Sequence, residues 1–169
     1  MGIAVVAYSG LRQMDESEVI YKELFDEDNE VIEKFPENGF TFCKNKHFPH
    51  AAQDIPDDAV YSSESSTSFH AGSYSGYGEW RNWLAKIVGW ESVNVAWEKG
   101  EYGQPFMELL KFSDCDGVLG TEVCKKLAKD FLDYEKEAMQ SSNDYHTELY
   151  QKWKSLFVLA SNNGAISFH

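Results

Sequence analysis

Residues 69–81 read FHAGSYSGYGEWR, and in this stretch the chain turns helical. From its end onward, Trp80, Trp83, Leu84, Ile87 and Val88 follow the spacing of one helix face, and Gly89 ends the pattern. The stretch itself crowds glycines, hydroxyls, aromatic rings, one histidine and one arginine into the predicted helix entrance. Polar side chains on pliable backbone at such a place suit ligand binding better than core packing.

Further helices are expected in the C-terminal two thirds of the chain. Pro105 fits the first turn of a short helix, Thr121 is the expected N-cap of a longer one, and residues 143–162 are expected to form the last. Residues 3–8 are an apolar run typical of a buried strand, and residues 165–169 are expected to form a final short strand. We therefore predict an α+β fold in which a small sheet packs against about four helices.

The segment between these parts gives weaker signals. Residues 16–34 alternate charged and apolar side chains, a pattern compatible with a short helix or with a hairpin that turns at residues 26–29. Residues 40–42 resemble a short strand, and residues 44–58, with two prolines, resemble a surface loop. Residues 62–68 read SSESSTS, which predicts a mobile loop beside the site.

Length and composition indicate a single globular domain over residues 1–169, since 43% apolar residues can form a continuous core. The 28 acidic and 15 basic residues leave a net charge of −13. That charge argues against nucleic acid and anionic membranes as partners. No apolar run approaches the roughly 20 residues of a spanning helix, and the N-terminus lacks a signal-peptide pattern. Three widely spaced cysteines indicate reduced thiols, so we expect a cytoplasmic protein.

A second polar break, FSDCDGVLG at residues 112–120, also precedes a predicted helix. Residues 114–118 match the DxDG(T/V) fragment of haloacid-dehalogenase-like phosphatases. However, a predicted helix precedes the fragment, and the roughly fifty residues after it are too few for the parallel sheet of such an enzyme. A calcium loop would place Phe112 and Val123 where carboxylates are needed. We therefore assign no metal and no cofactor.

The cysteines could serve in a metal site or as a nucleophile, or they could be buried as small apolar residues. Cys43 with His47 and His50 gives one local CxxxHxxH pattern, which is weak evidence for zinc because structural sites usually show two spaced pairs. Cys115 and His70 could form a nucleophile and base. For Cys115 a small buried thiol is favoured, and for Cys124, inside its predicted helix, more strongly so.

The two polar breaks supply the candidate site. Backbone N–H groups at a helix entrance favour an anion, an arginine can clamp it, and aromatic rings can stack on a planar group. The ligand-binding candidates are His70, Gly72, Ser73, Tyr74, Tyr77, Trp80, Arg81, Ser113, Asp114 and Asp116, and the catalytic candidates are His70, Asp114 and His169. An equally weighted alternative is structural: Arg81 pairs with Asp114 or Asp116 and ties two helix starts together.

The same residues carry a resemblance. FHAGSYSGY with Trp80 and Arg81, Pro105-Phe106, FSDCDGVLG and the ending NNGAISFH make the chain similar to a family of small uncharacterised proteins of bacteria and their phages. The likeness covers residues 60–169, and no established activity comes with it. The resemblance implies that His70, Arg81, Ser113, Asp114 and His169 belong to one recurring constellation. It also implies that a phage-borne member could interfere with its host.

Three functions follow as hypotheses. The first is a binding protein that sequesters a small anionic, nucleotide-like ligand, which could interfere with host defence signalling. The second is a hydrolase for a phosphorylated small molecule, in which a histidine is the general base and an aspartate orients it or binds a metal. The third is an acidic protein that inhibits a basic host protein by mimicking the charge of nucleic acid.

Overall fold

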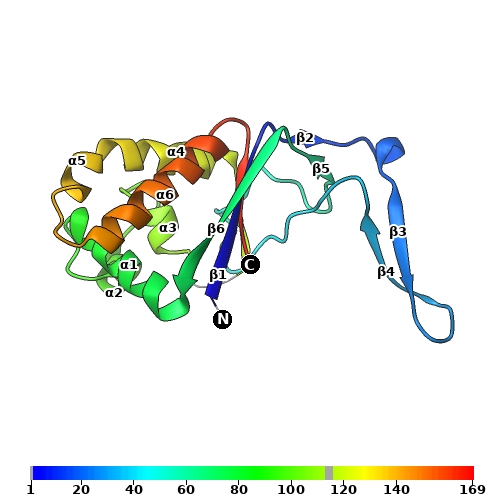
Figure 1. The fold of residues 1–169 in the computed structure, drawn as a ribbon, viewed down its shortest axis with the longest axis horizontal. Coiled ribbons are helices and arrows are strands. Elements are labelled where there is room, and N and C mark those ends of the chain that lie inside the picture. The colour runs from blue at the N-terminus through cyan, green and yellow to red at the C-terminus, as the bar shows by residue number, and fades with distance from the viewer. Residues whose placement is uncertain (1, 113–115) are drawn as a thin grey trace.

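The computed structural model describes residues 2–112 and 116–169 (Figure 1). These residues form a four-stranded antiparallel sheet and six α-helices, most of them in the C-terminal part, so the predicted α+β class is confirmed. The helices gather on one side of the sheet, and a long hairpin extends away from the other side (Figure 1). No helix in the described ranges is long and apolar enough to cross a membrane.

The predicted N-terminal strand is the centre of the sheet. Strand β1 (Gly2–Ser9) lies between β6 (Ser65–Ser73) and β8 (Ala165–Phe168), and β7 (Gly117–Leu119) completes the order β6-β1-β8-β7. Alternate side chains of β1, those of Ile3, Val5 and Ala7, are at most 3% exposed because they face the helices. The predicted C-terminal strand is confirmed as β8, which pairs with both β1 and β7.

Helices cover this buried face. They are α1 (Tyr74–Ile87), α2 (Val93–Lys99), α3 (Met107–Leu110), α4 (Thr121–Asp133), α5 (Glu135–Ala138) and α6 (Asp144–Ala160). Trp80 of α1 and Trp153 of α6 stack with ring centroids 5.6 Å apart, and neither is exposed to solvent. Large aromatic rings buried in this way dominate the energetics of a core of this size.

The boundaries of α4 and α6 agree closely with the sequence signals, whereas Pro105, expected in the first turn of a short helix, precedes α3, which begins at Met107 after the left-handed residue Phe106. Asn143 is the N-cap of α6, and its side chain accepts a hydrogen bond from the backbone N–H of His146 (3.0 Å). The N-cap of α4 is Gly120, one residue before the predicted Thr121. The hydroxyl of Thr121 instead donates to the carbonyl of Gly164, at 2.6 Å, and so joins α4 to the turn before β8.

Loops cover part of the other sheet face. The segment around residues 40–61, with the short strands β2 (Arg12–Gln13) and β5 (Tyr61–Ser62), forms a second small core. Its buried members are Ala52, Ile55, Ala59, Tyr61, Val118 and Ala165. Phe40 stacks on Tyr8 of β1 with ring centroids 4.6 Å apart. This cluster attaches the long connection to the sheet.

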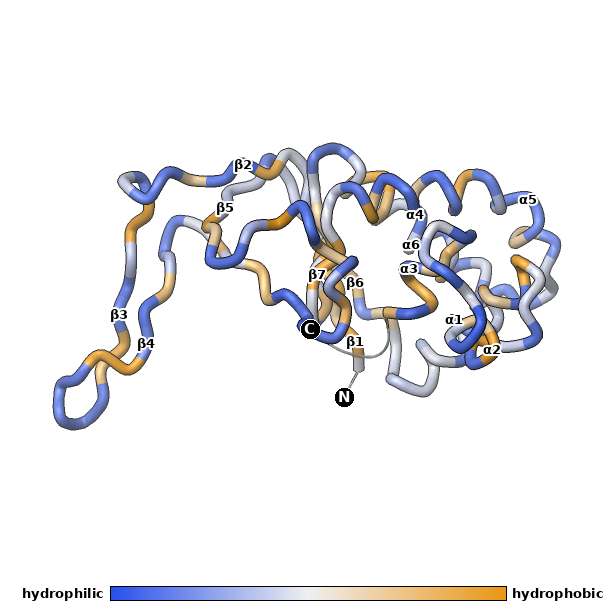
Figure 2. Tube along the Cα trace, turned by 180° about the vertical axis from the view of Figure 1, so that it is seen from behind, coloured by the Kyte–Doolittle hydropathy of each residue, from blue (hydrophilic) through white to orange (hydrophobic). Residues whose placement is uncertain are grey.

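The predicted alternatives for residues 16–34 are resolved in favour of the hairpin. A 3-10 turn (Glu16–Glu18) leads to β3 (Tyr21–Phe25), which pairs antiparallel with β4 (Val31–Pro36). The turn is closed by Asp26, whose backbone N–H donates to the carbonyl of Glu30 (2.9 Å). Every residue from 20 to 34 is exposed. We call residues 20–36 the arm; Figure 2 shows that they project from the rest of the chain, which we call the body.

Two local predictions were wrong, and one strand was not predicted. Residues 65–68 are not a loop but the first half of β6, because pairing with β1 outweighs the weak strand propensity of serine. Residues 40–42 are not a strand: Phe40 makes one bridge to Tyr61, and the rings pack on Tyr8 instead. Strand β7 was not expected, since its three residues become a strand only by pairing with β8.

Candidate functional site

The first predicted stretch is divided between the surface and the core. His70, Ser73 and Tyr74 are exposed where β6 ends and α1 begins. Gly72 has a φ of +104°, which lets the chain turn into the helix, and the hydroxyl of Ser73 accepts a hydrogen bond from the backbone N–H of Gly76 (3.1 Å). The helix entrance therefore lies on the surface, as a ligand site requires.

The aromatic candidates are placed differently. Tyr77 and Trp80 are completely buried, and the indole N–H of Trp80 donates to the carbonyl of His146 (3.2 Å). Both rings lie close to Trp153 in the core between α1 and α6. In this arrangement they cannot stack on a ligand. Of the ring candidates, Tyr74 alone is accessible, with 44% of its surface exposed.

Arg81 is also buried, with 8% of its surface exposed. One terminal nitrogen, Nη1, lies 2.9 Å from the carbonyl oxygen of Leu110 and 3.5 Å from that of Phe112. The guanidinium lies over the ring of Tyr77, 5.0 Å from its centroid. Arg81 thus joins α1 to the end of α3, and it brings the first stretch into contact with Phe112 at the start of the second.

The second stretch is described only in part, and the candidates Ser113 and Asp114, with Cys115, lie outside the described residues. Asp116 is exposed, and its carbonyl accepts a hydrogen bond from the side-chain amide of Asn45 (2.8 Å). The start of α4 is capped by Asp54, whose carboxylate accepts a hydrogen bond from the N–H of Glu122 (3.1 Å). A carboxylate of the chain itself therefore occupies the helix end where we expected an external anion.

Two catalytic candidates share one row of the sheet. Ala4 of β1 pairs with His70 on one side and exchanges two backbone hydrogen bonds with His169 on the other (3.1 and 2.9 Å). Both histidines are exposed on the face away from the helices, and two strand spacings put their Cα atoms about 10 Å apart. The imidazole of His169 lies 3.0 Å from the hydroxyl of Ser167. We call His70, Ala4 and His169 the histidine row.

The prediction of a small buried thiol is confirmed for Cys124, and the pairing of Cys115 with His70 lies outside the described residues. Cys43 is exposed, whereas Cys124 is buried in α4, where burial raises the pKa of its thiol and disfavours the reactive thiolate. Within residues 2–112 and 116–169, no three histidine, cysteine, aspartate or glutamate side chains are grouped closely enough to hold a metal ion.

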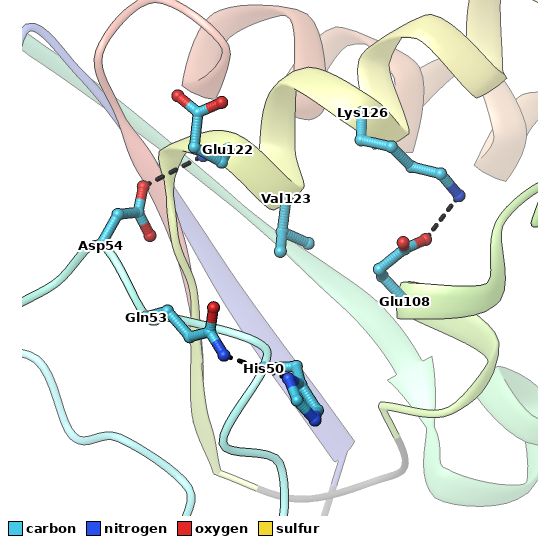
Figure 3. A pocket seen from close by; sticks show the side chains of 7 residues that line it. All are labelled: His50, Gln53, Asp54, Glu108, Glu122, Val123 and Lys126. Carbon is cyan, nitrogen blue, oxygen red and sulfur yellow. Dashed lines mark hydrogen bonds and ion pairs between the residues drawn. The ribbon is translucent and has the colours of Figure 1, made fainter. Parts of the chain in front are cut away.

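A cleft of about 450 Å³ lies between the loop of residues 50–54 and helices α3 and α4 (Figure 3). Lys126 is its one lysine, and it pairs with Glu108 and with Asp130 (2.7 Å to the latter). Asp54 and Glu122 lie at the other end of the cleft (Figure 3). Because carboxylates outnumber cations here, this cleft suits neither a phosphate nor another small anion.

The feature that sequence reasoning did not identify as functional is the arm. Six of the thirteen large apolar side chains that are exposed in the described part of the chain belong to it. They are Ile20, Tyr21, Leu24, Phe25, Val31 and Ile32, which are 41–64% exposed. The sequence signal for it is a run of apolar residues without a core-facing period, which indicates a helix or a hairpin but does not show that these residues are exposed.

Comparisons of the chain with protein-family models, with curated proteins and with solved structures found no match. The similarity of residues 60–169 to small bacterial and phage proteins therefore stays a prediction from sequence. Function has to be argued from the geometry of this chain.

Proposed function

We propose that this chain acts by binding another protein that presents a basic surface, and that the arm is its main contact element. The observation that carries the proposal is the group of six exposed apolar side chains on the arm. These side chains are distributed over both faces of the hairpin, and large apolar side chains gathered in such number on one exposed element often mark an interaction site. A two-stranded hairpin by itself is marginally stable in water, so contact with a partner would also stabilise it.

The charge of the arm supports a basic partner. Its seventeen residues contain six acidic side chains and two lysines, which gives −4 of the total charge of −13. Four of the acidic residues, at positions 26, 27, 28 and 30, lie in the turn at the tip. A second copy of this chain would bring like charges together, whereas a basic surface would be attracted over several ångströms. This is the third of the functions expected from the sequence.

An armless variant tests the proposal. The backbone N–H of Glu37 donates to the carbonyl of Ile20 at 2.7 Å, so a two-residue Asn-Gly turn can replace residues 21–36 without moving the body. The full chain and the armless variant are cross-linked to cellular proteins, and candidates that cross-link to arm residues are then purified and titrated against both. We expect a basic partner whose Kd rises about tenfold or more without the arm and rises further between about 0.05 and 0.5 M salt. Equal affinity for both forms, or an acidic partner, would refute the proposal.

A small-anion site is a second candidate, and the histidine row is the observation that favours it. His70 lies close to the exposed entrance of α1, and His169 is exposed on the same face of the sheet, with its imidazole against the buried hydroxyl of Ser167, so two imidazoles share one open surface. Mass spectrometry of molecules released from the heat-denatured protein would identify a retained ligand. An intact nucleotide-like anion supports sequestration, and a hydrolysis product supports an enzyme. Binding should weaken in His70→Ala but not in His47→Ala, an exposed histidine elsewhere; if both bind alike, the row is not the site.

A further inference from the structure

We infer, on the basis of the proposed function, that the partner inserts an extended basic segment into a cleft at the root of the arm. This root cleft has a volume of about 390 Å³ and lies between β4 and two loops of the body. Tyr21 and Pro36 line it from the arm, and Phe42, Asp58 and Val60 line it from the body. A neighbouring cleft of about 360 Å³ shares Tyr21, Asp58 and Val60, so the ring of Tyr21 borders both.

The chemistry of the root cleft suits a lysine or arginine side chain. Tyr21, Phe42 and Val60 offer apolar surface to the methylene stem, and Glu33 and Asp58 offer carboxylates to the charged end. The one lysine of the cleft, Lys34, is already engaged: its Nζ lies 3.9 Å from a carboxylate oxygen of Glu23 and 4.6 Å from the ring centroid of Tyr21. The cleft therefore keeps a negative balance for an incoming cation.

The backbone of β4 favours an extended partner segment. Both ribbon and tube views place β4 on the body side of β3 (Figures 1 and 2). In an antiparallel pair only alternate residues bond to the partner strand. The backbone N–H of Glu37 donates to the carbonyl of Ile20, so the residues of β4 that bond to β3 lie an even number of positions from Glu37. Lys34 lies three positions from Glu37, and its backbone groups therefore point away from β3 and toward the root cleft. An edge strand with such groups can pair with an added strand, and Pro36, which has no N–H, would end that pairing at the root.

A peptide selection tests this inference with a defined probe. A displayed library of random twelve-residue peptides is selected on the full chain after removal of peptides that bind the armless variant. We expect the enriched sequences to alternate lysine or arginine with valine, isoleucine or aromatic residues, as an added strand requires. No arm-dependent peptide, or enrichment of acidic or non-alternating sequences, would refute the inference. An arm-dependent protein partner found without any arm-dependent peptide would leave the proposed function standing and reject the root cleft.

A matched pair of variants locates the contact. Tyr21 and Leu24 lie on the same strand, are 41% and 42% exposed, and point to opposite faces of the arm, but only Tyr21 lines the root cleft. With a synthetic copy of the selected peptide, Tyr21→Ser should raise the Kd about tenfold or more, and Leu24→Ser should change it less than about twofold. Equal effects, or a larger effect of Leu24→Ser, would show that the peptide binds elsewhere on the arm.

Discussion

At the scale of single residues, burial decides whether a side chain is available for function. Arg81 lies about 100° around the helix from Trp80, at the edge of the predicted apolar face, so the sequence allowed it to be a ligand clamp or a structural residue. In the structure its guanidinium donates to backbone carbonyls and is covered by neighbouring elements. His70 and His169, which the sequence also indicates as candidate site residues, are exposed.

Replacement of Arg81 by alanine should destabilise the fold. The substitution leaves the carbonyl of Leu110 without its charged donor and removes packed methylene groups, so we expect a loss of about 1.5–3 kcal/mol in the free energy of unfolding, measured with urea. Lys86→Ala, an exposed change on the same helix, should cost less than about 0.5 kcal/mol. An Arg81→Ala variant as stable as the Lys86→Ala variant would contradict the structural role.

His146 should make stability depend on pH. Burial lowers the pKa of its imidazole below the ordinary value, and the carboxylate of Glu79 opposes this only in part. As the pH falls through about 6.5, this imidazole binds a proton in the unfolded chain but stays neutral in the folded chain. The free energy of unfolding therefore falls. The drop in unfolding free energy between about pH 7.5 and 5.5 should be smaller in His146→Gln than in the wild type. The exposed control His47→Gln should keep the wild-type drop; equal drops in all three proteins would exclude this role.

At the scale of elements, pairing along both edges of the last strand fixes the end of the chain in the sheet. The last strand, β8, pairs with β1 and β7, and Phe168 is 1% exposed between Trp153 and Phe112. Gly164 permits the preceding turn, because a Cβ there would lie 1.9 Å from the carbonyl oxygen of Tyr8. The end of the chain is therefore part of the core.

Deletion of residues 167–169 should lower stability strongly. Loss of one buried phenylalanine alone costs about 3–5 kcal/mol, and the deletion also removes ladder hydrogen bonds. Thermal unfolding of the truncated chain measures the effect. His169→Ala, which keeps the backbone pairing with Ala4, should leave the melting temperature nearly unchanged. An unchanged melting temperature after truncation would show that β8 contributes little to the core.

The arm differs from β8 because its apolar side chains are exposed and not part of the core. Every residue from 20 to 34 is exposed, and only Phe35 and Pro36 of the replaced stretch are half-buried, so the armless variant should lose no more than about 1 kcal/mol in the free energy of unfolding. Chemical denaturation followed by tryptophan fluorescence reports on the core alone, since all five tryptophans lie outside the arm. A large loss of stability would mean that the arm supports the body, and its apolar surface would then need another explanation.

At the scale of the whole molecule, charge works against compactness. With a net charge of −13, the acidic side chains repel one another in the folded chain. Exposed ion pairs such as Lys125 with Glu122 offset little of this repulsion. An increase from about 0.02 to 0.2 M salt should therefore raise the melting temperature by a few degrees. The armless variant, with a net charge of −9 after loss of −4, should gain less. A melting temperature that falls with salt would indicate that attractive pairs dominate.

The sequence by itself determined the fold class, the apolar strand 3–8, the long helices and the C-terminal strand, because each has a hydrophobic period or a cap that acts locally. It also indicated His70 and His169 as candidate site residues. Their separation in the sequence does not show that both lie beside Ala4 in the sheet. Tertiary structure alone decided the rest. Pairing with β1 made a strand of residues 65–68, and packing buried Tyr77, Trp80 and Arg81 at an entrance that had appeared to be a binding site. The exposure of the arm was also hidden from the sequence, because apolar residues have the same pattern whether or not another element covers them.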